Sequence, residues 1–365
     1  MADDAHFMAR AIRLAEKGLY TTDPNPRVGC ILVKNDRVVG EGFHLTSGEG
    51  HAEAIAIADA GGEVQGATAY VTMEPCSFHG RTPSCAKALV TAGVKRVVAA
   101  MMDPHDRNAG KGYRILQDAG VELTSTLLES SARKLNPGHV KRYEAGLPYV
   151  RLKLAMSLDG KTALANGASQ WITGSEARRD VQKLRARSSA IVTGVQTIID
   201  DDPSLTVRAK ELDGENIELA VSRKRPVYVL DSKLRVPANA KIVDSPDNVL
   251  VSIAGAAAGK SFNCRLLEIE GDDTGRVPLS RFLKQLASED CNEVLFECGP
   301  TLAGSLVEQG HCDEVVIYMA PKIMGSGAKS LLKVPEIDTM GDLFNVNITD
   351  FRFIGDDIRI TAVPN

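Results

Sequence analysis

One histidine, two cysteines and one glutamate carry the clearest chemical pattern in this sequence. His51 stands two residues before Glu53, and Cys76 and Cys85 follow in that order. An imidazole and two thiolates are ligands that Zn²⁺ prefers, and three protein ligands leave a fourth position open for water. Zinc lowers the pKa of such a water to about 7. The pattern therefore predicts a hydrolytic centre that holds one Zn²⁺ per chain on His51, Cys76 and Cys85, with Glu53 as the catalytic proton carrier.

The expected elements around these residues fit such a centre. Glu53 falls in the first turn of a predicted helix over 52–60, and Cys76 follows a predicted strand over 69–73. Cys85 opens a predicted helix over 85–92, where the positive helix end favours a thiolate. His-x-Glu followed by Pro-Cys and a second Cys is typical of zinc deaminases, although eight residues (77–84) separate the cysteines here. A structural zinc site with His79 as fourth ligand is the alternative.

Helices and short apolar strands alternate through the first part of the chain, which predicts a layered α/β domain. The predicted helices cover 4–18, 85–92 and 112–119 besides 52–60, and the predicted strands cover 28–33, 38–43, 69–73, 96–102 and 121–127. A polar helical stretch over 129–146 is interrupted at Asn136-Pro137-Gly138, and Gly146-Leu147-Pro148 follows it. We therefore expect one domain over residues 1–146 and a second over 147–365.

The second part restarts the alternation and predicts another α/β domain, with an antiparallel edge. Its predicted strands cover 149–155, 190–193, 226–230, 248–253, 293–297, 314–320, 351–354 and 358–363, and its predicted helices cover 175–186, 279–287 and 302–309. A strand that ends at Glu297 and a Gly299-Pro300 turn precede the last of these helices, whose first backbone N–H groups could hold a pyrophosphate.

Composition excludes several classes of protein. A chain of 365 residues is about two domains long. Its net charge of −4 and lack of a basic stripe argue against a nucleic-acid partner. No apolar run approaches the roughly 18–20 residues of a membrane span, and the acidic start does not resemble a secretory signal. Seven cysteines without framework spacing indicate a reducing compartment, so we expect a cytoplasmic protein.

Longer segments around the metal ligands resemble the deaminase domain of the bifunctional RibD family of riboflavin biosynthesis. They are Thr22–Gly29, Gly50–Glu53 and Glu74–Cys85, the last with the Gly80-Arg81-Thr82-Pro83 insert that separates this family from other cytidine deaminases. The resemblance implies a cytidine-deaminase-like three-layer α/β/α fold. It also implies deamination of 2,5-diamino-6-(5-phosphoribosylamino)pyrimidin-4(3H)-one, and substrate contacts by Asn25, Arg81 and Lys111.

The chain departs from the family pattern at two places. The family carries His two residues after the first metal-binding Cys, whereas here that position is Phe78 and His79 follows. The family carries Asp-Pro-Asn-Pro where this chain has Asp103-Pro104-His105-Asp106. The resemblance places both positions at the pyrimidine pocket. We therefore expect altered base recognition, in which His79 or His105 takes over or deamination changes in efficiency, with the metal chemistry unaffected.

The second half resembles the family's reductase domain, which is similar to dihydrofolate reductase. The segments are Lys153–Lys161, Ser169–Thr173, Arg178-Arg179-Asp180, Asp201–Arg208 and Glu297–Ser305. The resemblance implies NADPH as cofactor and reduction of the ribosyl group of 5-amino-6-(5-phosphoribosylamino)uracil to ribityl. The implied cofactor contacts are Ala155, Trp171, Thr197, Asp201, Gly299, Pro300, Thr301, Leu302, Ala303, Gly304 and Ser305, with Ser232 as a further candidate. The implied substrate contacts are Ser169, Arg185, Leu205, Arg208 and Glu297.

The proposed reduction needs a hydride at the sugar C1′ and a proton on the ring oxygen. Asp201 and Lys153 are the titratable candidates for handling that proton or aligning the substrate. Lys153 lies inside an apolar strand, where unpaired lysine is rare, whereas Asp201 belongs to an Asp200-Asp201-Asp202 run that could also form a loop or helix cap.

Three hypotheses follow for the whole chain. The first is a zinc deaminase joined to an NADPH reductase, acting on a small phosphoribosyl-aminopyrimidine. The second is an enzyme that retains only one of the two activities. The third is a structural-zinc, nucleotide-binding regulator. A homodimer formed through the reductase domain is expected from the resemblance, with no nucleic acid and no membrane as partners.

Overall fold

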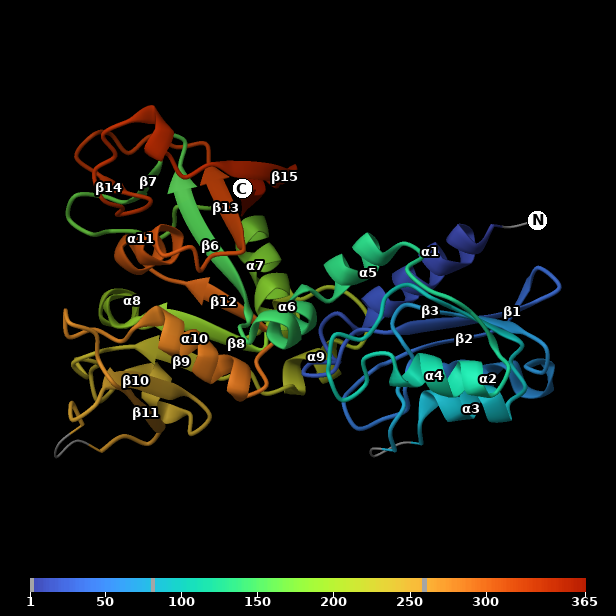
Figure 1. Ribbon diagram of the computed structural model, residues 1–365. Coiled ribbons are helices and arrows are strands. Elements are labelled where there is room, and N and C mark those ends of the chain that lie inside the picture. Colours follow the sequence, from blue (N-terminus) through green and yellow to red (C-terminus); the bar gives the residue numbers. More distant parts are fainter. Residues whose placement is uncertain (1–2, 80–82, 258–260) are drawn as a thin grey trace. The chain divides into compact units, whose positions relative to one another are not determined.

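The computed structural model describes residues 3–79, 83–257 and 261–365 (Figure 1). Arg81, expected to contact substrate, lies outside the described residues. The chain divides into two compact units, Met1–Gly146 and Leu147–Asn365. Throughout the described part, every helix is too short or too polar to cross a membrane.

A five-stranded sheet forms the centre of the first unit, in the order β2-β1-β3-β4-β5. The strand β1 pairs antiparallel with β2 and with β3, whereas β3, β4 and β5 run parallel. The strands are β1 (Gly29–Lys34), β2 (Arg37–Phe43), β3 (Thr68–Val71), β4 (Arg96–Ala99) and β5 (Glu122–Thr124). The helices are α1 (Asp4–Ala15), α2 (Ala52–Ala60), α3 (Cys85–Thr91), α4 (Lys111–Asp118), α5 (Glu129–Leu135) and α6 (Pro137–Ala145), with short 3₁₀ turns at Glu16–Gly18 and Gly61–Glu63.

Helices cover both faces of this sheet, as Figure 1 shows for α2, α3 and α4 on one side and α1 and α5 on the other. Two separate apolar clusters result, one between the sheet and α2–α4, the other between the sheet and α1, α5 and α6. The helix α2 approaches β2 so closely that a Cβ at Gly42 would stand 2.4 Å from the carbonyl oxygen of Ala52. The predicted three-layer arrangement is confirmed, and the start of α2 is held tightly against the sheet.

The second unit contains a nine-stranded sheet in the order β11-β10-β9-β8-β12-β6-β13-β16-β15. Neighbours from β11 to β13 run parallel, and β16 and β15 add the antiparallel edge that the sequence predicts. The strands of this sheet are β6 (Tyr149–Ser157), β8 (Ala190–Gly194), β9 (Val227–Leu230), β10 (Val249–Ile253), β11 (Arg265–Ile269), β12 (Glu293–Glu297), β13 (Glu314–Ala320), β15 (Val346–Ile354) and β16 (Asp357–Pro364). A separate ribbon pairs β7 (Lys161–Ala163) with β14 (Lys329–Ser330).

Helices again pack on both faces of this sheet. The helices α10 (Leu279–Ser288) and α11 (Pro300–Glu308) share one apolar cluster with the strands, whereas α7 (Ser175–Arg187) and α8 (Val195–Asp201) pack in two others. The remaining short elements are α9 (Ile217–Ser222) and 3₁₀ turns at Ala209–Glu211, Lys241–Asp244 and Met340–Asp342. In a parallel sheet covered on both sides, ligands bind beyond the carboxyl ends of the strands.

Candidate active sites

Two helix starts and one loop bring the three predicted metal ligands together. His51 caps the N-terminus of α2, Cys85 is the first residue of α3, and Cys76 lies in the loop after β3. The His51 Nδ1 atom stands 3.3 Å from the Cys85 Sγ and 3.6 Å from the Cys76 Sγ. All three ligand atoms lie within 4.8 Å of one another, and no other such group of His, Cys, Asp and Glu occurs among the described residues.

These distances fit a tetrahedral zinc ion. With Zn–N near 2.0–2.1 Å and Zn–S near 2.3 Å, tetrahedral angles place the nitrogen about 3.6 Å from each sulfur. His79, the possible fourth ligand, is exposed and does not belong to the group. The trio is therefore suited to hold a metal with one coordination position left for a small molecule, which favours a catalytic over a structural centre.

Glu53 lies beside the ligands without joining them. Its side chain is buried, and burial together with the Cys76 sulfur raises the pKa of the carboxyl to about 7. A hydrogen bond with the Cys85 thiol lowers the pKa of Cys76 to about 4, whereas that same contact and burial raise the pKa of Cys85. The site thus contains a thiolate, on Cys76, and a carboxyl group, on Glu53, that can take up and release a proton near neutral pH.

His44 is a site residue that the sequence interpretation missed. It follows β2, is buried, and its ring lies 5.3 Å from that of His51. The His44 Nδ1 is 3.0 Å from the carbonyl oxygen of Gly50 and its Nε2 is 3.0 Å from the Asn25 Nδ2. Because a carbonyl only accepts, Nδ1 is the donor and Nε2 accepts from the amide of Asn25. Asn25 is thereby oriented beside the metal site, where its predicted substrate contact requires it.

The loop that carries Cys76 is fixed by the buried carboxylate of Glu74. This carboxylate accepts backbone N–H bonds from Gly110 and Gly112 at 2.9 Å each, and from Asp103 and Tyr113 at 3.3 Å each. These donors surround the start of α4, where the helix dipole also favours a negative charge. The contacts join the segment next to the metal ligand to the loop at 103–112.

We expect Gly112→Ala to disturb the metal site, although residue 112 binds no metal. A Cβ at position 112 would stand 1.9 Å from the carbonyl oxygen of Pro75, so α4 and the ligand loop would have to separate. Overpacking of this kind costs about 1–3 kcal/mol of unfolding free energy. Calorimetry and metal analysis should show a lower unfolding temperature and weaker zinc retention. Gly62→Ala, where an added Cβ meets nothing within 4 Å, is the matched control, and equal behaviour of the two variants would contradict this account.

Aromatic and cationic side chains surround the two positions at which the chain departs from the family pattern. His105 stacks on Tyr143 with ring centroids 4.1 Å apart, and burial lowers its pKa. Phe78 lies under the Arg107 guanidinium, whose Cζ is 3.8 Å from the ring centroid. Lys111 donates from Nζ to the carbonyl oxygens of Asp106 and Arg107 at 3.0 and 3.2 Å. Lys111, the predicted substrate contact, therefore also holds its own loop together.

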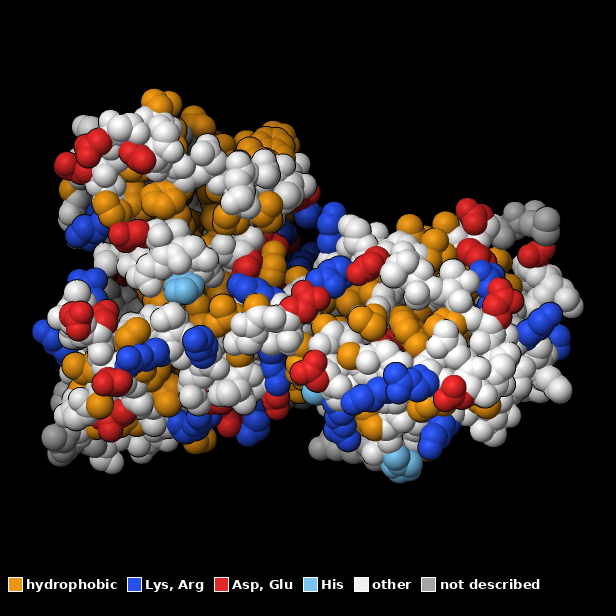
Figure 2. Space-filling model, in the orientation of Figure 1, with side chains coloured by type: hydrophobic (Ala, Val, Ile, Leu, Met, Phe, Trp, Pro, Cys, Tyr) orange, Lys and Arg blue, Asp and Glu red, His pale blue; other side chains and the backbone are white. Residues whose placement is uncertain are grey.

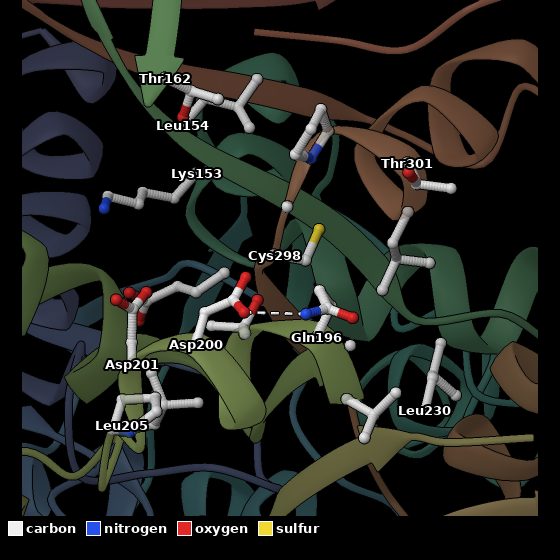
Figure 3. Close-up of a pocket in the computed structure, with 18 of the residues that line it drawn as sticks. Lys153, Leu154, Thr162, Gln196, Asp200, Asp201, Leu205, Leu230, Cys298 and Thr301 are labelled. Atoms are coloured by element: carbon white, nitrogen blue, oxygen red, sulfur yellow. Dashed lines mark hydrogen bonds between the residues drawn. The ribbon is translucent and has the colours of Figure 1, made fainter. Parts of the chain in front are cut away.

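A large cavity of about 1860 Å³ in the second unit collects most of the residues predicted for the reductase (Figure 3). It opens beyond the carboxyl ends of β8, β9 and β12, and its volume exceeds that of a typical small-molecule pocket. The predicted catalytic and substrate-contacting residues that line it are Lys153, Ser169, Arg185, Asp201, Leu205, Arg208 and Glu297. The predicted cofactor contacts that line it are Ala155, Trp171, Thr197, Asp201, Ser232, Gly299, Pro300, Thr301, Leu302 and Ser305.

Ala303 and Gly304 do not line this cavity, which corrects the prediction for these two residues. Ala303 is fully buried in the core shared by α11 and the sheet. A Cβ at Gly304 would stand 2.0 Å from the carbonyl oxygen of Lys333, so this glycine permits close packing of that segment on α11. Helical geometry explains the difference, because only one side of α11 can face the cavity.

A charged group spans the base of the cavity. Glu297 accepts two hydrogen bonds from Arg185, at 2.6 and 3.0 Å, and it is the register partner of Lys153 on the adjacent strand. Burial opposes the charge on Glu297, but Arg185 and Lys153 outweigh it and lower the pKa of that carboxyl. Burial lowers the pKa of Lys153, and Glu297 offsets this only in part.

Asp201 occupies the same side of the cavity as Lys153 in Figure 3. It ends α8, and its Oδ1 accepts from the Ser169 Oγ at 3.4 Å and from the Gln170 Nε2 at 3.2 Å. The sequence did not predict α8, and the cluster around Val195 and Ile198 places the carboxylate at the cavity. An ammonium and a carboxylate thus stand at one wall, where a proton could be donated and a polyol aligned.

Models of known families match both units of the chain. The model of the cytidine and deoxycytidylate deaminase zinc-binding region matches residues 1–101, and the model of the RibD C-terminal domain matches residues 148–360. The chain is 45% identical to the riboflavin biosynthesis protein RibD of Haemophilus influenzae, over 100% of this chain and 98% of that protein. It is 44% identical to RibD of Escherichia coli K12, over 99% of each chain.

Solved structures show the same two-unit architecture. Acinetobacter baumannii RibD, form 1, has a TM-score of 0.90 at 42% identity, over 99% of both chains. A Thermotoga maritima protein described as a diaminohydroxyphosphoribosylaminopyrimidine deaminase/5-amino-6-(5-phosphoribosylamino)uracil reductase has a TM-score of 0.86 at 29% identity, again over 99% of both chains. The likeness therefore extends over both units rather than one.

Proposed function

This chain belongs to the RibD family, and from that membership we propose that it catalyses two consecutive steps of riboflavin biosynthesis. The first unit removes an amino group from 2,5-diamino-6-(5-phosphoribosylamino)pyrimidin-4(3H)-one by hydrolysis. The second unit reduces the ribosyl group of the resulting 5-amino-6-(5-phosphoribosylamino)uracil to ribityl. The observation that carries the proposal is the coexistence of a three-ligand metal site with a buried Glu53 in one unit and a cavity with Lys153, Asp201 and Glu297 in the other.

In the first unit, the protein's own residues move protons and orient the base. His51, Cys76 and Cys85 would hold Zn²⁺, which when bound supplies a water with a pKa near 7. The Glu53 carboxylate accepts the proton of the attacking water as oxygen bonds to the amino-bearing carbon. Glu53 then delivers that proton to a ring nitrogen. The remaining proton of the added hydroxyl passes through Glu53 to the amino group, so that the C–N bond breaks, a carbonyl forms and ammonia leaves. Asn25, oriented by His44, donates to the pyrimidine.

In the second unit, the strand ends and the start of α11 would hold NADPH, which supplies the hydride for C1′. Thr301 and Leu302, in the first turn of α11, line the cavity, and the backbone N–H groups of a helix start suit a pyrophosphate. Lys153 donates a proton to the sugar ring oxygen as the C1′–O bond opens, and Asp201 aligns the hydroxyl groups. Arg185 is mostly buried and paired with Glu297, whereas Arg208 contacts Glu211 but keeps more than half of its side chain exposed. Arg208 also lines the cavity, and it would bind the phosphate.

Separate assays of the two half-reactions test this proposal. Zinc-loaded protein should release ammonia from the diaminopyrimidine without NADPH, and it should oxidise NADPH with the aminouracil product after zinc is removed by a chelator. Activity in only one assay would support the single-activity hypothesis. Activity in neither, with zinc and NADPH bound, would support the regulator.

We also propose that the protein forms a homodimer through the edge of the second unit. The edge strand β15 exposes Val346, Ile348, Phe351 and Phe353, each about half to two thirds accessible. A register shift between Ile348 and Asp350 keeps these side chains on one face on either side of the bulge. Figure 2 shows hydrophobic side chains gathered over this edge. Apolar patches of this kind mark interaction surfaces.

The seven free cysteines support a reducing, cytoplasmic location.

A double substitution on the exposed apolar face of β15 should separate the dimer. We expect Phe351→Glu with Phe353→Glu to give a monomer in light scattering at concentrations where the parent chain is dimeric, because like charges would then face each other without water. Asn347→Glu, at an exposed position on the opposite face of β15, is the matched control. A parent chain that is monomeric, or a double variant that still dimerises, would rule out this interface.

A further inference from the structure

We propose that Arg107 binds the 5′-phosphate of the pyrimidine substrate at the deaminase site, with Phe78 as the platform that holds its guanidinium. The inference rests on the proposed function, because it takes the substrate to be a phosphoribosyl-aminopyrimidine. Phe78 is one position at which this chain departs from the family pattern, and Arg107 directly follows the other, at His105-Asp106. The pair is thereby given a role in substrate recognition.

The loop that carries Arg107 is attached to the segment that follows the metal ligand Cys76. Asn108 is fully buried, and its Oδ1 accepts the backbone N–H of Ser77 at 2.8 Å. Its Nδ2 donates to the Asp103 Oδ2 at 3.2 Å, and Asp103 also lies 3.3 Å from the His139 Nε2. Residue 107 is therefore held beside Ser77 and Phe78, in the segment that follows the metal ligand Cys76, rather than on an independent loop.

The guanidinium of Arg107 lies over the ring of Phe78, 3.8 Å from its centroid. Stacking leaves the N–H edges of a guanidinium available, because the ring contacts only its face. Among the described residues no carboxylate forms an ion pair with Arg107, and its side chain is exposed. The ring at position 78 thus replaces the hydrogen-bonding histidine of the family with a surface that orients a cation.

The neighbouring groups favour an anion at this place. Lys111 holds the loop through the carbonyl oxygens of Asp106 and Arg107, and so adds a second positive charge beside the first. The backbone N–H of Arg107 donates to the His105 Nδ1 at 3.2 Å, which further fixes the residue. A guanidinium fork matches the oxygen atoms of a phosphate dianion, which is the charged group of the proposed substrate. The rest of that substrate is neutral.

Steady-state kinetics of ammonia release test the inference. We expect Arg107→Met to raise KM about 10- to 100-fold with little change in kcat, and to weaken competitive inhibition by ribose 5-phosphate by a similar factor. Arg107→Lys should recover part of the loss, and Phe78→Leu should raise KM in the same direction. The unphosphorylated riboside should be used equally by parent and Arg107→Met. Lys87→Met, at an exposed lysine of α3, is the control.

Two outcomes separate this inference from the proposed function. If the zinc-loaded parent chain releases no ammonia from the phosphorylated pyrimidine, the proposed deaminase function is wrong. If the parent chain is active and Arg107→Met retains its KM and its inhibition by ribose 5-phosphate, the deaminase function stands and Arg107 is not the phosphate ligand. Zinc content of every variant shows whether the metal site itself is intact.

Discussion

Glu53→Gln is expected to lower the rate of ammonia release about 10²- to 10⁴-fold, while the protein still binds one zinc per chain. The amide has nearly the same shape as the carboxylate, so the buried position beside Cys85 stays filled. It cannot accept a proton from the attacking water, and this is the step that the buried carboxyl is proposed to perform. The rate should be measured under saturating substrate, with zinc determined on the same sample.

Two controls make this result specific. Glu63→Gln changes an exposed carboxyl group just after α2 and should leave ammonia release unchanged. NADPH oxidation by Glu53→Gln should also be unchanged, because the reductase residues all belong to the second unit. A Glu53→Gln variant that deaminates at the parent rate would show that another group carries the proton.

Lys153→Met should produce the corresponding loss in the second unit, about 10²- to 10⁴-fold in NADPH oxidation with ammonia release retained. Methionine fills the space of the lysine stem but has no proton to donate. Arg185 still satisfies Glu297 through two hydrogen bonds, so the base of the cavity should remain folded. Lys224→Met, at an exposed surface lysine, is the matched control.

The pH profile of the reductase provides a second readout for Lys153. Burial lowers the pKa of its ammonium below the ordinary value of 10.5. The donor is protonated below that lowered pKa and loses its proton as the pH rises through it, so NADPH oxidation should fall on the alkaline side before pH 10.5. Residual activity of Lys153→Met should lack this alkaline limb. If the limb persists in the variant, a different group titrates there.

The sequence predicted the metal site because each ligand stands at the boundary of an element. His51 caps α2, Cys85 starts α3, and both boundaries follow from local apolar patterning. The structure adds what spacing cannot show. His44 and Asn108 act through contacts to residues 19 and 31 positions away, to Asn25 and Ser77, and neither stands in a recognisable motif.

In the second unit, strands were predicted more reliably than short helices. The strand β13 has the predicted bounds, because a buried apolar run has a strong local pattern. The helix α8 contains three β-branched apolar residues with low helix propensity and depends on tertiary packing of Val195 and Ile198. From sequence alone, its last residue Asp201 therefore cannot be told apart from the rest of an acidic run.

Tertiary contacts also make two strands shorter or longer than the sequence predicts. The predicted strand over 121–127 contracts to β5 (Glu122–Thr124), whereas the predicted strand that starts at Phe351 extends back to Val346. The extension produces a longer apolar edge than the sequence indicated. This exposed apolar edge, together with the family resemblance, supports the proposed dimer through the second unit.

X-ray absorption at the zinc edge, on protein purified without chelators, would show whether His51, Cys76 and Cys85 bind a catalytic metal. We expect one zinc per chain, with two sulfur ligands near 2.3 Å and two nitrogen or oxygen ligands near 2.0–2.1 Å, of which only one is an imidazole. That result would place His51, Cys76 and Cys85 around a metal with one position left for solvent. A protein without bound metal, or a zinc with two imidazoles and no solvent ligand, would show that this trio does not form an open catalytic zinc site.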